Sequence, residues 1–295
     1  MKISSKRLLA VLCLNLITWQ SFSQQVDIFK TQDSLAVNKN EPVVNTFYST
    51  RLINSHTVEI TGKGSMDFRI NHRFGPLNQG LYEWFGLDQA SMRMGFDFGL
   101  SDNLQVGIGR TTYYKEYDGY IKYRLLHQRT NSTPLSIVWV GAFAWRSFDY
   151  NSTGITPKVT GSDKTYYTTQ LLIGSKLNNN TSFQVSPTYT HYNRLLGVTG
   201  GSTDLFSIGF LARQKVSKRM SINAEYFLQT KRFDGMSDPL SIGVDINTGG
   251  HVFQLHFTNS TGMNEHTFIH ETSGSWFDAV RWGFNISRIF HIGKR

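Results

Sequence analysis

Apolar and polar residues alternate along about twelve short segments of this chain, and the connections between the segments are alternately short and long. In the segment 89–100, Met94 and Phe96 share one parity, whereas Arg93 and Asp97 share the other. Side chains along a β-strand point to opposite faces with a period of two. The pattern therefore predicts strands that have one apolar face and one face of small or charged residues.

The alternation predicts twelve strands, at Ser65–Phe74, Gln89–Leu100, Leu104–Tyr113, Glu116–Gln128, Pro134–Trp145, Lys164–Leu177, Thr181–Tyr192, Asp204–Val216, Ser221–Lys231, Pro239–Asn247, His251–Asn259 and Ala279–Phe290. Connections at one end, such as 101–103, are short, whereas those at the other end, such as 146–163, are long. Outer-membrane barrels have short periplasmic turns and longer outer loops. We therefore predict an all-β fold, an antiparallel up-and-down transmembrane β-barrel of about 12 strands. Connections 114–115 and 129–133 fit this rule less well.

Residues 1–23 have the features of a secretory signal peptide. Basic residues precede an apolar stretch, and Ser21-Phe22-Ser23 forms a small-x-small cleavage site. The sequence therefore predicts export and, with the barrel, localisation to a bacterial outer membrane. The only cysteine, Cys13, lies inside the signal, so the exported chain would contain neither a disulfide nor a thiolate metal site.

Residues 24–64 are predicted to form a periplasmic lead-in. Within it, the stretch 46–64 leaves three alternatives open, which are a short strand, a plug inside the barrel and a periplasmic strap. The barrel itself is predicted to span 65–295. Its last strand ends on Phe290, which resembles the terminal aromatic signal read by the barrel-assembly machinery. That machinery and outer-membrane lipids are the partners we expect.

Composition supports strands and argues against other classes of protein. The chain has 14% aromatic residues and 26 glycines, which suits many short strands. No stretch after the signal has the ~18 uninterrupted apolar residues of a transmembrane helix. The net charge of +9 is spread along the chain instead of forming one basic stripe, so we predict no nucleic-acid partner.

Several motifs carry a resemblance to a known family. They are Asn71-His72-Arg73-Phe74-Gly75-Pro76-Leu77-Asn78, Phe85-Gly86-Leu87-Asp88-Gln89-Ala90, Val106-Gly107-Ile108-Gly109-Arg110, Tyr117-Asp118-Gly119 and His251-Val252-Phe253-Gln254-Leu255. Over nearly the whole exported chain, the sequence resembles a family of β-barrel proteins of unknown function from Bacteroidetes-type Gram-negative bacteria. This resemblance implies an outer-membrane barrel and no established activity, so it assigns no functional residue.

Charged side chains at inward positions are the candidate functional residues. They are Asp67, Arg69, Arg73, Arg93, Asp97, Asp118, Lys122, Arg124, Glu225, Asp245 and Arg281. One hypothesis is a polar conduit whose arginines steer anionic solutes. The other is a lumen closed by ion pairs, because charges taken out of water must be paired. Inward glycines such as Gly99 and Gly109 are predicted to open space for a solute or for the N-terminal segment, or to relieve strain in bent strands.

Catalytic and metal motifs are weak. His266 and His270 are four residues apart, flanked by Glu265 and Glu271, and would share one face of a helix. They lie in the predicted outer loop 260–278, which we expect to be solvated and polar, so we predict no metal site and name these histidines only as a weak candidate. We expect no cofactor.

The stretch Thr190-His191-Tyr192-Asn193, with Asp204 across a loop, is the one place to look for a hydrolase. It lacks the His-x-Ser-Asn-Gly arrangement of outer-membrane phospholipases, so we predict that the chain is not an enzyme. The sequence favours a passive pore for small polar or anionic solutes. The alternatives are a closed structural or docking barrel and, less favoured, a membrane-embedded hydrolase.

Overall fold

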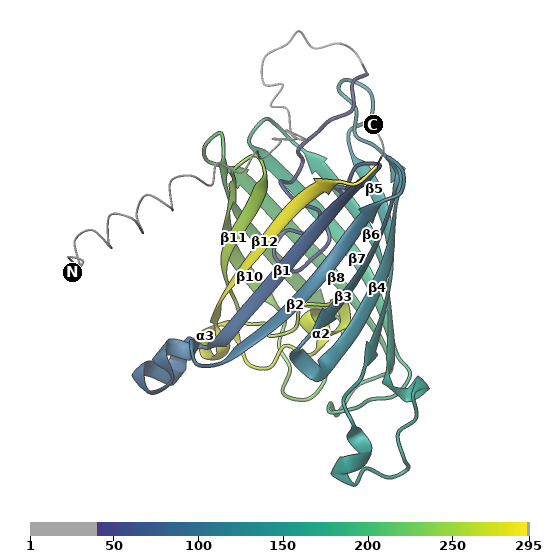
Figure 1. Cartoon of the computed structure of the whole chain (residues 1–295), viewed down its shortest axis with the longest axis vertical. Helices are drawn as coiled ribbons and strands as arrows, with labels where there is room; N and C mark the ends of the chain where they lie inside the picture. Colours follow the sequence, from purple (N-terminus) through teal and green to yellow (C-terminus); the bar gives the residue numbers. More distant parts are fainter. Residues whose placement is uncertain (1–39, 294–295) are drawn as a thin grey trace, which may run out of the picture.

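The computed structural model describes residues 40–293. The predicted signal peptide, 1–23, and the first part of the lead-in, 24–39, lie outside the described residues. Twelve antiparallel strands close into a barrel in chain order, and β1 pairs with both β2 and β12 (Figure 1). The strands are β1 Ser65–Pro76, β2 Ala90–Gly99, β3 Leu104–Thr111, β4 Glu116–Leu126, β5 Ser136–Arg146, β6 Thr165–Lys176, β7 Thr181–Tyr192, β8 Asp204–Lys215, β9 Met220–Gln229, β10 Leu240–Asn247, β11 His251–Thr258 and β12 Arg281–His291.

Short helices occur only in the connections of the described chain. They are η1 Leu77–Gly86, η2 Tyr113–Lys115, η3 Tyr150–Thr153, η4 Ser162–Lys164, α2 Glu265–His270 and α3 Trp276–Ala279. Among residues 40–293, none of these helices has the length and apolar character that a membrane span requires.

The predicted fold class is confirmed. All twelve predicted strands form, and their ends differ from the predicted ends by at most two residues. Burial follows the parity of the sequence, because exposed and buried residues alternate without a break from Asp204 to Gln214 in β8. Large apolar side chains such as Ile108 and Phe206 are exposed on the outside of the barrel. This is the arrangement that a membrane barrel needs, since its outer face meets hydrocarbon.

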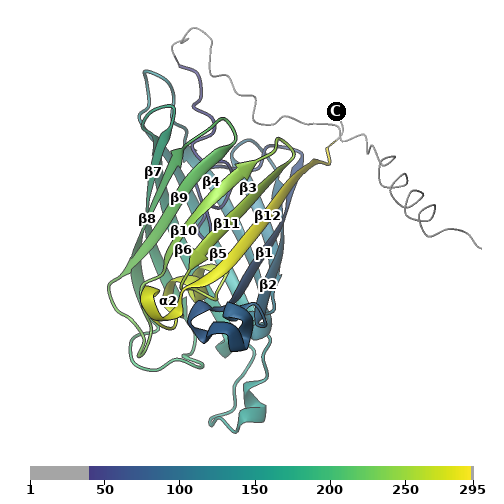
Figure 2. The same cartoon turned by 90° about the vertical axis from the view of Figure 1, so that its left-hand side faces the viewer.

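The two ends of the barrel differ, as the connection lengths predict. The turn end carries the short connections, for example 100–103 and 216–219, together with both ends of the described chain. The loop end carries the longer connections 77–89, 147–164 and 259–280, and the short connection 112–115. Figure 2 shows the turn end uppermost and the loop end below.

Two non-strand segments lie inside the barrel. Residues 46–58 form a re-entrant segment that enters from the turn end, turns, and returns to β1, and they are all buried (Figure 1). Residues 259–272, which include α2, fold inward from the loop end and are buried as well, apart from Thr261. The predicted solvated outer loop 260–278 is therefore wrong for its first part, because these residues fill the interior instead of facing water.

Candidate functional site: the occupied lumen

The tip of the re-entrant segment wraps around one carboxylate of the wall. A turn at 52–55 is closed by the Leu52 N–H, which donates to the Ser55 carbonyl at 2.9 Å. Glu225, from β9, accepts backbone N–H groups from Ile53 at 3.3 Å, Asn54 at 3.0 Å and Ser55 at 3.2 Å. It also accepts the Asn54 side-chain amide at 2.6 Å. Successive N–H groups at a turn make a concave anion site. The tip therefore binds the carboxylate of Glu225 in the way such a site binds an anion.

Strands further along the same side of the wall also bind this tip. Arg73 of β1 donates to the Asn54 Oδ1 at 2.7 Å, and Asn285 of β12 donates to the Ile53 carbonyl at 2.8 Å. The Gln254 amide of β11 donates to the carbonyls of Arg51 and Leu52. The tip is therefore held by one arc of the barrel, which runs from β9 to β1.

Further contacts fix the two arms of the segment. Lys122 donates to the Thr50 carbonyl at 3.2 Å and to the Glu59 carbonyl at 2.5 Å. Gln184 accepts from the Val58 N–H at 2.9 Å and donates to the His56 carbonyl at 2.8 Å. Most of these bonds join a wall side chain to the segment's backbone, and this satisfies backbone groups that could not stay unpaired when buried.

Near the turn end, Arg213 of β8 fixes the entry of the segment. Its guanidinium donates to the carbonyls of Asn45 at 2.6 Å and Thr46 at 2.8 Å, and lies 3.8 Å from the centroid of the Tyr48 ring. On the return arm, the Gln105 amide oxygen accepts from the Thr61 N–H at 2.8 Å.

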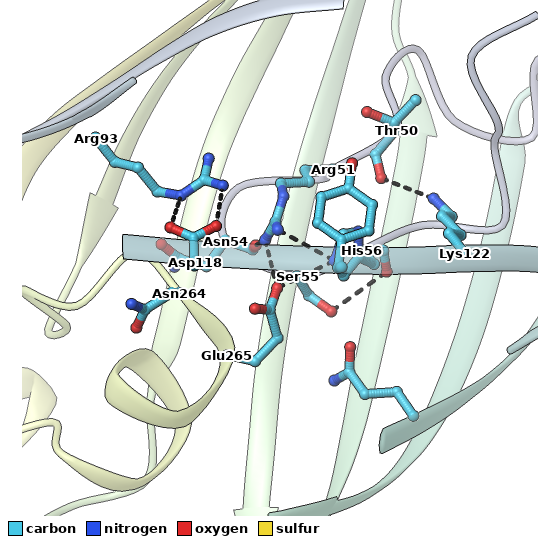
Figure 3. A network of polar contacts seen from close by, with 12 residues as sticks. Thr50, Arg51, Asn54, Ser55, His56, Arg93, Asp118, Lys122, Asn264 and Glu265 are labelled. Carbon is cyan, nitrogen blue, oxygen red and sulfur yellow. Dashed lines mark hydrogen bonds and ion pairs between the residues drawn. The ribbon is translucent and has the colours of Figure 1, made fainter. Parts of the chain in front are cut away.

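A buried ionic cluster joins the segment to α2. The Arg51 Nη1 lies 2.7 Å from the Glu265 carboxylate, and the His56 Nε2 lies 3.1 Å from the same oxygen (Figure 3). Burial by itself would raise the pKa of Glu265, but Arg51 and His56 outweigh it and hold that pKa well below its ordinary value. Burial and Arg51 lower the pKa of His56. The contacts of Arg51 and His56 with Glu265 therefore join the two inserted segments, which stabilise each other.

Apolar contacts complete the interior on one side. Phe47, Leu52 and Val58 of the segment pack in one cluster with Phe268 and Ile269 of α2. The wall residues of that cluster are Tyr120, Val138, Val140, Leu172, Leu211 and Phe227. Fully burying one such side chain contributes about 1.5–3 kcal/mol. The wall residues of this cluster therefore come from β4, β5, β6, β8 and β9, whereas the buried side chains of β1 include the charged residues Asp67, Arg69 and Arg73.

Glycines of the wall make room for these large groups. A side chain at Gly99 would lie 2.1 Å from the Gly62 carbonyl oxygen, and one at Gly109 would lie 2.4 Å from the Arg93 guanidinium. At these positions the glycines accommodate the N-terminal segment and a buried arginine, respectively.

Ten of the eleven predicted lumenal charges are buried, and Arg124 is half-buried near the turn end, where it donates to the Asp102 carbonyl. Four of them contact the re-entrant segment: Arg69, Arg73, Lys122 and Glu225. The others have wall or loop partners: Asp67 meets Arg69, Arg93 pairs with Asp118, Asp245 accepts from Gln254, and Arg281 donates to Thr261. Asp97 is buried beside Tyr120.

A family description matches residues 47–290, which is most of the chain: "Membrane bound beta barrel domain (DUF5777)". The chain belongs to this family. The match includes the re-entrant segment as well as the barrel wall. No curated protein matches the sequence.

Solved structures of two porins and of one further outer membrane protein resemble this membrane-bound barrel domain weakly. The NanC porin has 7% identity and a TM-score of 0.48, and the match covers 77% of this chain and 98% of that one. The KdgM porin has 9% identity and a TM-score of 0.46, with 77% and 99% covered. Omp33 of Acinetobacter baumannii has 11% identity and a TM-score of 0.39, with 77% and 99% covered.

Charge-only reasoning missed several residues that hold the interior of the membrane-bound barrel domain. Gln105, Gln184, Gln254 and Asn285 bind the segment, but an inventory of charges passes over amides. Their inward parity was the signal that could have identified them. Arg146 was placed in a loop, whereas it ends β5.

Arg146 is the centre of a second buried ionic cluster. Its guanidinium contacts Glu116 at 2.6 Å and Glu271 at 2.9 Å. Glu271 follows α2, so this cluster fastens the inserted loop to the wall. A buried guanidinium needs compensating charge, and the carboxylates of Glu116 and Glu271 supply it.

The candidate metal residues have separate partners. The His266 ring stacks on Tyr166 at 4.1 Å between centroids, and its Nε2 lies 3.3 Å from Glu116. The His270 Nδ1 contacts the Gln229 side-chain oxygen at 2.9 Å. Within residues 40–293, no group of three or more His, Cys, Asp or Glu side chains is arranged to hold a metal ion.

The hydrolase motif is divided by the wall. His191 lies 2.8 Å from Asp204 on the outside, where Tyr189 also donates to Asp204 at 2.5 Å. Thr190 points inward, where its hydroxyl meets Thr168 at 3.3 Å. Because neighbouring strand residues face opposite sides, the hydroxyl of Thr190 cannot reach the His191 ring.

Proposed function

We propose that this protein is an outer-membrane channel for small polar or anionic solutes, and that its own N-terminal segment holds it closed. The observation that carries the proposal is the path of the re-entrant segment. It enters and leaves the lumen at the turn end, where Val43 N–H donates to Gln128 and Gly64 N–H donates to Gly99. The segment can therefore withdraw without any strand of the wall separating.

The chemistry of the contacts supports a displaceable closure. Wall side chains bind the segment mainly through hydrogen bonds, and water can replace those partners when the segment leaves. Four of the charged wall groups that bind it are cations, Arg69, Arg73, Lys122 and Arg213, whereas one, Glu225, is an anion. Withdrawal would therefore expose a mostly positive pathway, which favours anions.

The second candidate is a permanently closed structural or docking barrel, and the apolar cluster around Phe47, Leu52 and Val58 favours it. A cluster of this kind stabilises the closed state whether or not an open state is used.

Planar-bilayer conductance of the chain from Gln24 onward separates the two candidates. A crosslink can lock the segment, because a side chain at Gly174 would lie 2.9 Å from the Val58 Cγ1. That spacing suits a disulfide, and a chain beginning at Gln24 has no other cysteine. Val58→Cys with Gly174→Cys should be silent when oxidised and should show openings when reduced. Each single-cysteine variant is the matched control.

Deletion of residues 24–61 should give sustained, anion-preferring openings, with the reversal potential measured under a salt gradient. The inserted loop 259–272 stays in this variant, so the deletion is also combined with Glu271→Gln, which releases that loop from Arg146. If both variants fold and both stay silent, the channel is refuted and the closed barrel remains.

A further inference from the structure

A projection at the loop end displays large apolar side chains to the outside. η1 follows β1 directly and exposes Leu81 at 76%, Tyr82 at 91% and Trp84 at 65%. Phe277 of α3 is exposed at 90%. Soluble surfaces avoid apolar patches of this kind unless something covers them.

η1 and α3 form one unit, which we name the aromatic shelf and define as residues 77–88 and 276–279. The Asn78 amide donates to the Asp278 carbonyl at 2.6 Å, and the Leu77 N–H donates to the Val280 carbonyl at 2.9 Å. At Gly86, a side chain would lie 2.2 Å from the Gly75 carbonyl oxygen, so the end of η1 packs closely on the end of β1. The shelf is therefore fixed to the barrel at two strands.

The backbone of the shelf is unusual for aromatic residues. Trp84 has a φ of 48° and Phe85 a φ of 55°, both in the left-handed region. Bulky residues adopt this region at an energetic cost, and such outliers concentrate at functional positions.

The shelf continues the lipid-facing surface of the barrel. On the outside of the neighbouring strands, Phe74 of β1 and Phe284 of β12 form a ring pair, and Trp282 packs on Phe257 at 4.4 Å. Pro76, which precedes the shelf, pairs with Arg281 beside Trp282. The shelf thus begins where the apolar outer face of β1 and β12 ends.

The direction of the projection distinguishes the shelf from the other long connections. In Figure 1 the blue coil of η1 lies to the side of the barrel at the loop end, and in Figure 2 this side faces the viewer. In both views the connection 147–164, with η3, extends away along the barrel axis. The stretch 77–89 contains no Lys or Arg, and its Trp and Tyr are the residues enriched at membrane–water interfaces.

We propose that the aromatic shelf lies in the interfacial layer of the leaflet at the loop end and inserts Leu81, Tyr82, Trp84 and Phe277 among the lipids. The shelf acts as a lateral anchor that fixes the depth of the barrel beside the β1–β12 seam.

Depth-dependent quenching tests this proposal. The chain from Gln24 is prepared with Tyr82→Cys carrying an environment-sensitive fluorophore, and is reconstituted in dioleoylphosphatidylcholine vesicles. Ser152→Cys, in η3, is the matched control because it is also exposed at the loop end. We expect the label at 82 to shift to shorter wavelength and to be quenched by lipid spin-labelled near the ester carbonyl. The label at 152 should do neither.

A second variant separates insertion from local changes at the label. Trp84→Ser with Phe277→Ser, in the Tyr82→Cys background, should reduce quenching at 82 at least severalfold while the barrel stays folded. A label at 82 that is as accessible to aqueous iodide as the label at 152 would overturn the proposal. In that case the shelf would be a surface for a protein partner instead.

Discussion

Replacement of Glu225 by Gln isolates the contact between the wall and the tip of the re-entrant segment. The side chain keeps its size, but the carboxylate that accepts three backbone N–H groups and the Asn54 amide becomes a neutral amide. One of its two oxygens is replaced by an NH₂ group, which faces N–H donors and cannot accept from them.

The expected magnitude follows from the bonds lost. Hydrogen bonds to charged groups contribute about 1.5–3 kcal/mol each. The amide retains one acceptor, and water compensates part of the loss, so we expect the closed state to be weakened by about 3 kcal/mol. Since about 1.4 kcal/mol corresponds to a tenfold change, the open fraction should rise roughly 100-fold.

Chemical labelling at the tip measures this change. Ser55 is fully buried and its N–H contacts Glu225. In the chain that begins at Gln24, which has no other cysteine, Ser55→Cys is therefore a near-isosteric reporter. A water-soluble maleimide reacts only when the tip is released, and when reclosing is fast the rate follows the open fraction. Glu225→Gln should therefore accelerate labelling roughly 100-fold.

Asp118→Asn supplies the matched control. It makes the same chemical change at a buried wall position, but Asp118 pairs with the wall residue Arg93. Labelling in this variant should stay within a few-fold of the parent. Equal rates for Glu225→Gln, Asp118→Asn and the parent would show that the tip contact does not hold the lumen closed.

Three further predictions follow from the buried charges. Arg146→Met leaves Glu116 and Glu271 buried without their cation, and should lower the free energy of unfolding, measured in urea, by about 3–5 kcal/mol. The control Arg110→Met, at an exposed position, should lower it far less. Equal urea midpoints for the two variants would contradict the role given to this cluster. Burial lowers the pKa of His270 in α2 to about 3, whereas the unfolded chain titrates near the ordinary value of about 6.5. Between these two pKa values the unfolded chain binds one more proton than the folded chain. The contribution of His270 to stability is therefore complete above about pH 6.5 and falls toward pH 3. His270→Gln should reduce the fall of the urea midpoint with decreasing pH, and an unchanged slope would refute the assignment. In the barrel that lacks residues 24–61, Lys122→Glu should move the reversal potential toward cation preference more than Arg124→Glu does. The reason is that Lys122 binds the re-entrant segment, whereas Arg124 lies near the turn end. Equal shifts would count against a solute pathway along the space that the segment occupies.

The wall of this barrel could be predicted closely because its physics is local. Alternation with a period of two determines which residues face lipid, and connection lengths determine which ends are joined by turns. β7, for example, begins and ends at the predicted residues Thr181 and Tyr192. The inward parity of Arg73 and Glu225 was readable for the same reason.

The contents of the lumen could not be predicted in the same way. The stretch 46–58 forms several of its contacts with wall residues more than a hundred positions away, such as Gln184 and Glu225, and no period in the sequence encodes them. For 260–278, polar residues and Gly262 suggested a solvated loop. Its polar side chains instead found buried partners, as Asn264 does at Glu116.

The way in which the segment is attached also has a mechanical consequence. Both arms leave the lumen at the turn end, so tension on the chain before Asn40 would act first on the backbone bonds of Asn40 and Val43. It would act next on the carbonyls of Asn45 and Thr46 that Arg213 holds. The bonds at Ser49 and Thr50 would be loaded next, and those of the tip at Glu225 last. Bonds broken in sequence resist far less force than bonds sheared together. A modest pull from that side of the membrane would peel the segment out while the strands of the barrel stay unstressed.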